Sequence, residues 1–479
     1  MAASRKYWHR MNAHKTTIIG SGPAGMGCAY TLAEEGAPFL LVDENNEAGG
    51  LCRTIDFNGY LFDVGGHRFL SKSGTVNSLW YKMLDEDLTR VRRLSRIYYR
   101  RRFFKYPLHF LDTLWNLGVW ESGLCFLDYL KNKIFPSGDK NTFEGWIINN
   151  FGRRLYNIFF RTYTEKVWAV ACRDLSADWA KQRIKGLSLR VALKNSLPGK
   201  RKNAPKTLSE EFIYPKNGPG EFYLRLQKNC LERGGSFSFG TRAVKIRHND
   251  KRIVAVETES VSDGKKGTIE TDYLFSSMPL PVCARLLEPA PPQEVIAAAG
   301  RLKFRDLITV NVILDREYIF PDQWLYVHSP EVRLGRIQNF KNWSPSMVPD
   351  AEKTSLGLEY FCSEGDDLWR KDDINLINFA LKELEKIGIT SRRYLIDAFV
   401  VRQPNAYPFY SMDYLKNIGI IRDYLSRFDN FQTMGRAGLF RYDNSDHALL
   451  TGIYAANNYL GKGHSDLWHV NADSEYLES

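Results

Sequence analysis

The segment GSGPAG at residues 20–25 constrains the fold of this 479-residue chain more than any other. Its G-x-G-x-x-G spacing lies between an apolar β run at 16–19 and a helical stretch that continues to Glu35. A second β run at 39–42 completes a βαβ unit and ends at Asp43. Such glycines allow a tight turn and let backbone N–H groups approach a pyrophosphate, while the acid accepts ribose hydroxyls. The predicted dinucleotide contacts are Gly20, Gly22, Gly25 and Asp43.

Two later glycine-rich segments fit the same site. Gly49-Gly50-Leu51-Cys52-Arg53-Thr54 places a second glycine pair beside an arginine, which can wrap the pyrophosphate from outside. Gly435-Arg436-Ala437-Gly438 precedes a predicted helix that starts near Asn444. A helix N-terminus there would stabilise the negative charge of a reduced flavin ring. Read singly, each segment is also compatible with an ordinary turn.

Strand and helix patterns alternate along the chain, and 44% of its residues are apolar, enough for more than one core. The predicted fold is α/β: a Rossmann-type FAD-binding domain with a helical insertion and a mainly antiparallel β-sheet substrate domain. The FAD-binding domain is expected to be discontinuous, with the helical domain at 91–217 and the sheet domain at 286–427. The expected pieces of the FAD-binding domain are 14–90, 218–285 and 428–470.

The net charge and the cysteine content limit which partners the protein is expected to bind and in which cellular compartment it is expected to lie. The net charge of +11 favours anionic partners, but no nucleic-acid motif accompanies the arginine-rich run at 90–102, so nucleic-acid binding is not expected. Seven scattered cysteines without a C-x-x-C pair indicate a reducing, cytoplasmic setting and no metal site. We see no secretory signal. Carboxylates interrupt the apolar stretch at 110–130, which argues against a membrane span and leaves peripheral contact at the inner membrane face as an option.

With these motifs the chain resembles a known protein family. The βαβ unit followed by G-G-x-x-R-T is similar to the protoporphyrinogen oxidase and amine oxidase superfamily of flavoproteins. Further segments resemble, more narrowly, the UDP-galactopyranose mutases, especially the long eukaryotic type. These segments are FDVGGH at 62–67, YTEKVW at 163–168, Gln182-Arg183, WLY at 324–326, and the stretches 336–345 and 436–447.

The resemblance implies FAD, bound non-covalently and active when reduced, with NAD(P)H as a candidate reductant. It implies a sugar mutase that interconverts pyranose and furanose forms of a UDP-galactose-like nucleotide sugar, or of another diphosphate-linked sugar, through a flavin N5–sugar adduct. Such a reaction belongs to polysaccharide biosynthesis. It has no net redox change and needs cations at the diphosphate, for which the planar fork of arginine is well suited.

Matched residue by residue, the resemblance assigns three sets of positions. The catalytic set is His67, Arg183 and Arg336. The substrate-binding set is Tyr106, Trp168, Tyr326, Tyr407, Tyr442 and Asn444. The cofactor-binding set adds Gly50, Leu51, Arg53, Gly66, His67, Arg436 and Asp446 to the first motif. Without the family, a structural salt bridge would explain each arginine and core packing each aromatic residue.

The chain departs from the family pattern where uracil would bind. Leu108 stands where the family prefers an aromatic residue, His109 where it prefers an amide, and Thr164 replaces an asparagine. The carrier of the sugar, nucleotide or polyprenyl lipid, therefore stays open. So do two other functions: an FAD-dependent oxidoreductase acting on an isoprenoid or related lipid-like substrate, and a binding module like the prenyl-protein escort factors. The sugar and the oligomeric state are also left open.

Overall fold

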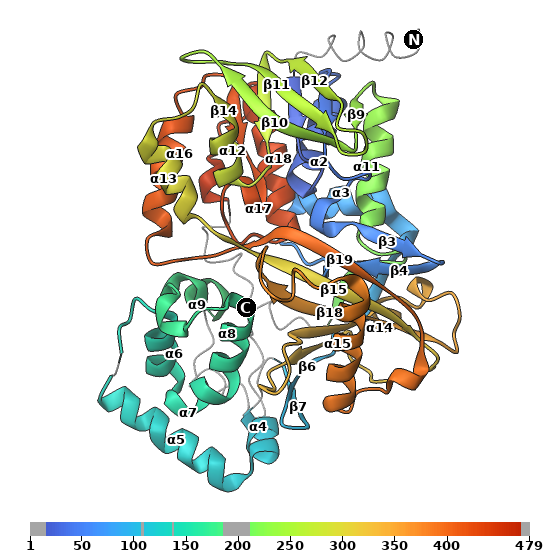
Figure 1. Cartoon of the computed structure of the whole chain (residues 1–479), viewed down its shortest axis with the longest axis vertical. Helices are drawn as coiled ribbons and strands as arrows, with labels where there is room; N and C mark the ends of the chain where they lie inside the picture. Colours follow the sequence, from blue (N-terminus) through green and yellow to red (C-terminus); the bar gives the residue numbers. More distant parts are fainter. Residues whose placement is uncertain (1–15, 107–109, 137, 185–210, 471–479) are drawn as a thin grey trace.

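The computed structural model describes residues 16–106, 110–136, 138–184 and 211–470. Figure 1 places a parallel sheet and its helices at one end, a long mixed sheet across the middle, and a group of helices at the other end. The combination of a Rossmann-type unit, a helical insertion and a mainly antiparallel sheet confirms the predicted fold class.

The Rossmann-type unit is a five-stranded sheet in the order β20-β13-β1-β2-β9, with every neighbouring pair parallel. Its strands are β1 (Thr16–Ile19), β2 (Leu40–Val42), β9 (Ser236–Ser238), β13 (Tyr273–Ser276) and β20 (Phe431–Thr433). The helices that share its core are α2 (Pro23–Glu34), α3 (Gly74–Leu84), α11 (Gly220–Glu232) and α18 (Ser445–Tyr459). Strands far apart in the chain thus form one sheet, so the unit is discontinuous.

Glycines bring α2 and α18 into unusually close contact. A Cβ on Gly27 would lie 2.5 Å from the Leu449 carbonyl oxygen, and one on Gly452 would lie 1.9 Å from that of Ala24. Only glycine allows two helix backbones to approach this closely. The contact fixes the N-termini of both helices at the same end of the parallel sheet.

A second, four-stranded sheet has the order β12-β11-β10-β14. Its strands are β10 (Thr241–His248), β11 (Ile253–Ser260), β12 (Lys266–Glu270) and β14 (Leu287–Glu288). Strand β9, which precedes β10 in the chain, does not join this sheet and pairs with β2 instead. Three helices share its apolar core: α12 (Leu280–Leu286), α13 (Gln293–Arg301) and α16 (Tyr414–Leu425). Since α13 and α16 pack with the Rossmann-type unit, the ends of the predicted 286–427 domain belong structurally with that unit.

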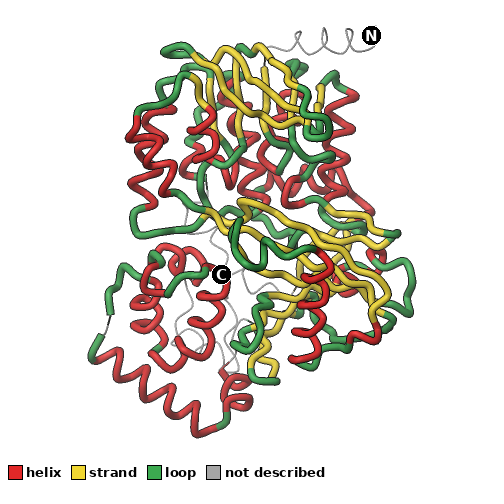
Figure 2. The backbone as a smooth tube through the Cα atoms, viewed as in Figure 1, coloured by secondary structure: helices red, strands yellow, loops and turns green. Residues whose placement is uncertain are grey.

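The long sheet, whose strands are drawn in yellow across the middle and lower part of Figure 2, has the order β19-β15-β18-β17-β16-β6-β7. Its strands are β6 (Ser95–Tyr99), β7 (Arg102–Lys105), β15 (Phe304–Leu314), β16 (Trp324–Val327), β17 (Arg336–Asn339), β18 (Thr354–Cys362) and β19 (Leu395–Pro408). The predicted helical character of 91–105 was wrong. Strand β6 pairs in parallel with β16, more than 200 residues later, and a pairing of that range leaves no local periodic signal.

The helical region packs against the long sheet through a shared apolar core. It consists of α4 (Phe110–Leu117), α5 (Val119–Ile134), α6 (Phe143–Phe151), α7 (Arg153–Leu155), a π-helical turn at Tyr156–Arg161, α8 (Thr162–Trp168) and α9 (Ala177–Ile184). Gly118 separates α4 from α5. In the described part of the chain, no helix is long and apolar enough to cross a membrane.

Smaller elements complete the fold. They are β3 (Thr54–Phe57), β4 (Tyr60–Asp63), β5 (Leu88–Arg92), β8 (Glu211–Pro215), α14 (Phe340–Trp343), α15 (Asp373–Lys386) and α17 (Gly435–Gly438). Leu88 begins strand β5. The seven cysteines are buried and free.

Candidate active site

One cavity of about 930 Å³ joins the Rossmann-type unit, the long sheet and the helical region. Its lining includes most of the residues predicted for cofactor and substrate. They are Gly20, Gly22, Asp43, Gly50, Leu51, Gly66, His67, Tyr106, Trp168, Tyr326, Arg336, Tyr407, Arg436, Tyr442, Asn444 and Asp446. Residues from three separate parts of the chain therefore meet in one space, as the matched motifs require.

The glycine motif forms the floor of the cavity at the N-terminus of α2. Gly20 has a φ of +96°, and a Cβ on Gly25 would lie 1.7 Å from the Gly20 carbonyl oxygen. Gly22 caps the helix without a side chain, so the first backbone N–H groups have no capping acceptor. The turn therefore leaves donors and partial positive charge available to a pyrophosphate. Gly25 acts by allowing this packing and does not itself line the cavity.

The second glycine pair packs directly on the first. The Gly49 N–H donates to the Ser21 carbonyl at 2.9 Å, and a Cβ on Gly50 would lie 2.9 Å from the Gly22 Cα. Arg53 differs from the expectation, because it does not line the cavity. Its guanidinium donates to the Gly50 carbonyl at 2.8 Å and to Gln403 Oε1 at 2.9 Å. It therefore holds the glycine turn against strand β19.

Asp43 lies at the end of β2, as predicted, and its carboxylate already accepts four hydrogen bonds. Ser21 donates from its backbone N–H at 2.5 Å and its hydroxyl at 2.7 Å to Oδ2. Asn45 donates from its backbone N–H at 2.7 Å and its amide at 2.8 Å to Oδ1. A ribose hydroxyl would have to compete with these donors for the oxygens of Asp43.

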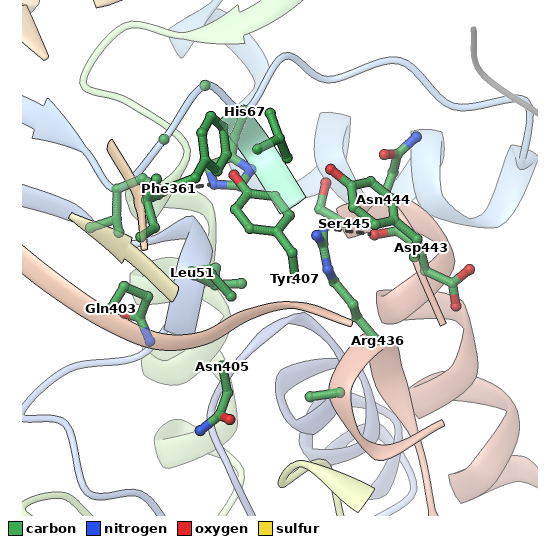
Figure 3. A pocket seen from close by; sticks show the side chains of 18 of the residues that line it. Leu51, His67, Phe361, Gln403, Asn405, Tyr407, Arg436, Asp443, Asn444 and Ser445 are labelled. Atoms are coloured by element: carbon green, nitrogen blue, oxygen red, sulfur yellow. Dashed lines mark hydrogen bonds between the residues drawn. The ribbon is translucent and has the colours of Figure 1, made fainter. Parts of the chain in front are cut away.

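Arg436 is the residue best placed to bind an anionic ligand. Its guanidinium lies 4.2 Å from the centre of the Tyr442 ring and 5.0 Å from that of Tyr407, and Figure 3 shows it directed into the same part of the pocket as Tyr407. Nη1 donates to the Asp443 carbonyl at 3.2 Å, whereas Nε and Nη2 are buried and have no partner among the described residues. Buried donors of this kind are normally satisfied. Together with the glycine cradle, they fit a bound dinucleotide.

Arg336 lies across the cavity on β17 and is held in place by a buried carboxylate. Its Nε donates to Glu359 Oε2 at 2.6 Å, its Nη2 also pairs with that oxygen, and Nη2 donates to the Tyr407 hydroxyl at 2.7 Å. Glu359 is fully buried, and Gln338 Nε2 donates to its other oxygen at 2.7 Å. Burial opposes the charge of Arg336, yet the Glu359 carboxylate raises its pKa well above the ordinary value. The guanidinium is a fixed cation facing the cavity.

The predicted aromatic residues form two groups on the cavity wall. Tyr407 and Tyr442 stack with ring centres 5.8 Å apart, and Trp168 lies 6.5 Å from Tyr442. Tyr106 and Tyr326 form the second group at 4.7 Å. Desolvation raises the pKa of both Tyr326 and Tyr407 to about 12, so their hydroxyls remain hydrogen-bond donors at neutral pH.

Three predicted positions cannot be placed by side chain. Arg183 belongs to α9 by its backbone, but its side chain lies outside the described residues, as do Leu108 and His109 entirely. Thr164 is buried and lines the cavity. The roles of Arg183 and of the 108–109 pair stay predictions.

His67 lines the cavity among the predicted FAD-binding residues, and its imidazole ring is expected to stay neutral. Its Nε2 lies 3.2 Å from the Val64 carbonyl and its Nδ1 lies 3.8 Å from Cys52 Sγ. Desolvation lowers the pKa of His67 to about 4, and the charges of Arg436 and Arg336 act in the same direction. Gly66, which precedes it, has no room for a Cβ beside the Gln338 amide, at 2.8 Å.

The shifted pKa gives a testable pH dependence. Because the folded pKa of about 4 lies below the ordinary 6.5, the neutral ring contributes stability above pH 6.5 that is lost as pH falls through 4. We expect the ring signals of His67 in histidine-labelled NMR spectra to remain unchanged from pH 8 to about pH 5. Assignment by His67→Gln identifies them. A midpoint near 6.5 would contradict the packing described above.

Sequence reasoning missed the residues that orient Arg336. Glu359 was a usable signal, since it is a lone charge within the apolar strand segment LGLEYFC. Lys166 is a second buried charged residue whose role was not predicted. Its Nζ donates to the carbonyls of Val327, Ser329 and Leu334, and desolvation lowers its pKa to about 8. It ties α8 to the β16–β17 connection and stands outside the cavity lining. This lysine is therefore structural, although it sits in one of the matched motifs.

Comparisons with known proteins agree with this geometry. The sequence profile of the family described as flavin containing amine oxidoreductase matches residues 23–458. A probable UDP-galactopyranose mutase from Klebsiella pneumoniae is 26% identical over 182 residues, which is 36% of this chain and 45% of that protein. A phytoene desaturase from Phycomyces blakesleeanus is 43% identical over 53 residues, 11% of this chain and 9% of that protein. The chain thus spans less than half the length of these curated relatives.

Solved structures share the fold over nearly the whole chain. A crystal structure of reduced UDP-galactopyranose mutase superposes with a TM-score of 0.82 at 23% identity, covering 96% of this chain and 98% of that one. An oxidoreductase from Methanosarcina mazei gives 0.61 at 14% identity, covering 92% and 99%. At these identities the similarity establishes the fold.

Proposed function

Because the chain belongs to the flavin-containing amine oxidoreductase family and is therefore a flavin-dependent enzyme that uses FAD, we propose that it rearranges the ring of a diphosphate-linked sugar. In this proposal it is a mutase that interconverts pyranose and furanose forms, with a UDP-galactose-like nucleotide sugar or a lipid-linked sugar diphosphate as substrate. The overlap with reduced UDP-galactopyranose mutase supports the idea through the fold alone.

The observation that carries the proposal is the pair of cations at the cavity. Arg336 is fixed by Glu359 and donates to the Tyr407 hydroxyl, while Arg436 stands over the rings of Tyr407 and Tyr442. Two guanidinium groups that both contact Tyr407 suit a doubly anionic group, because each can bind phosphate oxygens through more than one N–H. Arg183 is the proposed third member of this clamp.

In this reaction the main task of the protein is to position the sugar and the diphosphate. A pyranose and a furanose differ only in which sugar hydroxyl closes the ring, so no atom or electron is gained or lost overall. The bond between the anomeric carbon and the diphosphate must break and re-form, and the arginines stabilise the separated diphosphate and keep it in place. Reduced FAD, when bound, would supply the electron-rich centre that this exchange needs. His67, Gly66 and the aromatic wall keep water from the reacting carbon.

Activity should therefore depend on the oxidation state while consuming no reductant in proportion to turnover. We expect enzyme reduced with dithionite to convert UDP-galactofuranose to the pyranose, detected by anion-exchange chromatography and proton NMR. Air-oxidised enzyme from the same preparation is the control and should be inactive. Equal turnover by the oxidised enzyme would rule out the mutase mechanism.

A second candidate is an oxidoreductase acting on an isoprenoid or related lipid-like substrate. It is favoured by the apolar part of the cavity wall, which includes Leu117, Phe143, Phe151 and Phe159. This activity predicts that one NAD(P)H or O₂ disappears for each substrate converted. Measuring both in the same assay separates the two candidates.

A further inference from the structure

The cavity has a second, apolar arm that the sugar-diphosphate site does not explain. Beyond Tyr106 and Tyr163 it continues among the helices at the far end of the molecule from β1 and α2 (Figure 1). Its lining there includes Leu117, Phe126, Phe143, Phe151, Leu155 and Phe159. Among the described residues of α4 to α7 that line the cavity, none carries a charge. A nucleoside, with its many hydrogen-bonding groups, is poorly matched to such a wall.

The outer face of the same helices is also apolar. Trp115 is 86% exposed, Trp120 81% and Ile134 70%, and they share this surface with Val119, Leu127, Leu130 and Phe135. Such a concentration of large apolar side chains in water marks an interaction surface. Phe126 both lines the cavity and is 43% exposed, so the interior arm and the outer face meet at this residue.

The charged residues of α5 that are classed as exposed are both basic. Exposed Lys131 and Lys133 lie on α5, whereas its carboxylates Glu121 and Asp128 accept hydrogen bonds from Arg154, both at 2.9 Å. Helix α5 is therefore amphipathic with its apolar and basic sides toward solvent.

A basic hairpin lies beside α4. Its turn, Arg100-Arg101, joins β6 to β7, and Arg102 and the Lys105 backbone bond to α4 at the Asn116 carbonyl and the Asp112 carboxylate. Both turn residues have positive φ, +50° and +61°, which glycine or asparagine would adopt far more easily. Keeping two arginines in a strained turn places cations at the tip of the molecule, next to the apolar face.

From these observations we infer that α4 and α5 dock on an anionic lipid surface, and that the apolar arm takes the hydrocarbon chain of a polyprenyl-type lipid diphosphate sugar. This rests on the proposed function and names the carrier of its sugar. Tryptophans and apolar side chains enter the headgroup boundary while lysines and arginines meet anionic headgroups. A second copy of the chain fits less well, because a symmetric contact would bring the same cations together.

Vesicle sedimentation tests the docking face. We expect the holoenzyme to bind vesicles made of equal parts phosphatidylcholine and phosphatidylglycerol, to bind phosphatidylcholine alone at least tenfold more weakly, and to be released by high salt. The double variant Trp120→Glu/Ile134→Glu, at exposed positions, should lose binding at least tenfold. Ile374→Glu is the matched control, since Ile374 is equally exposed on α15, far from this face, and should bind as wild type. Unchanged binding by the double variant would overturn the inference, as would sedimentation equilibrium showing a dimer that the double variant dissociates.

Ligand binding tests whether the apolar arm holds the hydrocarbon chain of a lipid diphosphate. Farnesyl diphosphate and inorganic pyrophosphate are titrated against the visible spectrum of the bound flavin. We expect farnesyl diphosphate to bind at least tenfold more tightly than pyrophosphate, and Leu117→Trp or Phe126→Glu to remove that difference while leaving pyrophosphate binding intact. Equal affinity for the two probes would overturn the lipid carrier and leave the diphosphate clamp standing. If neither probe binds, the proposed function itself fails.

Discussion

Gly25→Ala is expected to yield a protein that no longer retains FAD. The new Cβ would lie 1.7 Å from the Gly20 carbonyl oxygen and 2.9 Å from its carbon, and both are backbone atoms. The clash can be relieved only by moving the 20–22 turn away from α2, which removes the geometry that presents N–H groups to the pyrophosphate. Overpacking of this kind costs about 1–3 kcal/mol. The flavin-to-protein absorbance ratio should fall at least tenfold, and the thermal midpoint should drop by several degrees.

Gly419→Ala is the matched control for that variant. Gly419 lies within helix α16, has no positive φ, and a Cβ there would meet no atom within 4 Å. Alanine in a helix interior is favoured over glycine by about 0.5–1 kcal/mol. This variant should keep its flavin and match or exceed the wild-type thermal midpoint. Full flavin content in purified Gly25→Ala would contradict the assignment of the glycine motif.

Arg336→Lys is expected to lower kcat/KM for a sugar diphosphate by about 10²–10³, the usual effect of removing a preorganised donor at developing charge. Lysine keeps the positive charge, so the buried carboxylate of Glu359 retains a counter-ion and the fold should survive. Its ammonium lacks the planar fork through which the guanidinium bonds Glu359 by two nitrogens while also donating to the Tyr407 hydroxyl. The loss should therefore fall mainly on kcat, with a smaller change in KM.

Arg333→Lys is the comparison for this second variant. Its guanidinium pairs with the exposed carboxylate of Asp367, and an exposed pair of this kind contributes about 0–1 kcal/mol. Its activity should stay within twofold of wild type. A double-mutant cycle between Arg336→Lys and Glu359→Gln should give strongly non-additive losses, because Glu359 acts by positioning the arginine. Additive losses, or an Arg336→Lys enzyme with wild-type kcat, would remove Arg336 from the clamp.

Local patterns were enough for the βαβ unit formed by β1, α2 and β2. The glycine spacing, the apolar runs at 16–19 and 39–42, and Asp43 all express short-range requirements of a turn, a strand and a helix start. For this reason the βαβ unit and FAD were predictable. The positions of Arg53 and Glu359 were not, since Arg53 bonds Gln403 on the distant strand β19 and Glu359 meets Arg336 only through the pairing of β17 with β18.

The arginine-rich segment at 90–105 illustrates the other case. Read locally it has no strand period. Pairing with β8 makes its first residues part of a two-stranded sheet, and pairing with β16 and within the β6–β7 hairpin makes 95–105 part of the long sheet. The apolar arm is similar, because helical spacing alone cannot tell whether Phe126 or Leu117 faces a core, a cavity or solvent.

The amino-acid sequence by itself determined the cofactor fold and its chemistry-bearing residue types, because steric limits on glycine turns and the period of apolar residues act over a few neighbours. The tertiary structure alone decided which cations face one space, which carboxylate holds Arg336, and where an apolar channel reaches the surface. Those outcomes depend on burial and on contacts between separate elements, some of them hundreds of residues apart. No local pattern encodes the desolvation that makes these contacts important.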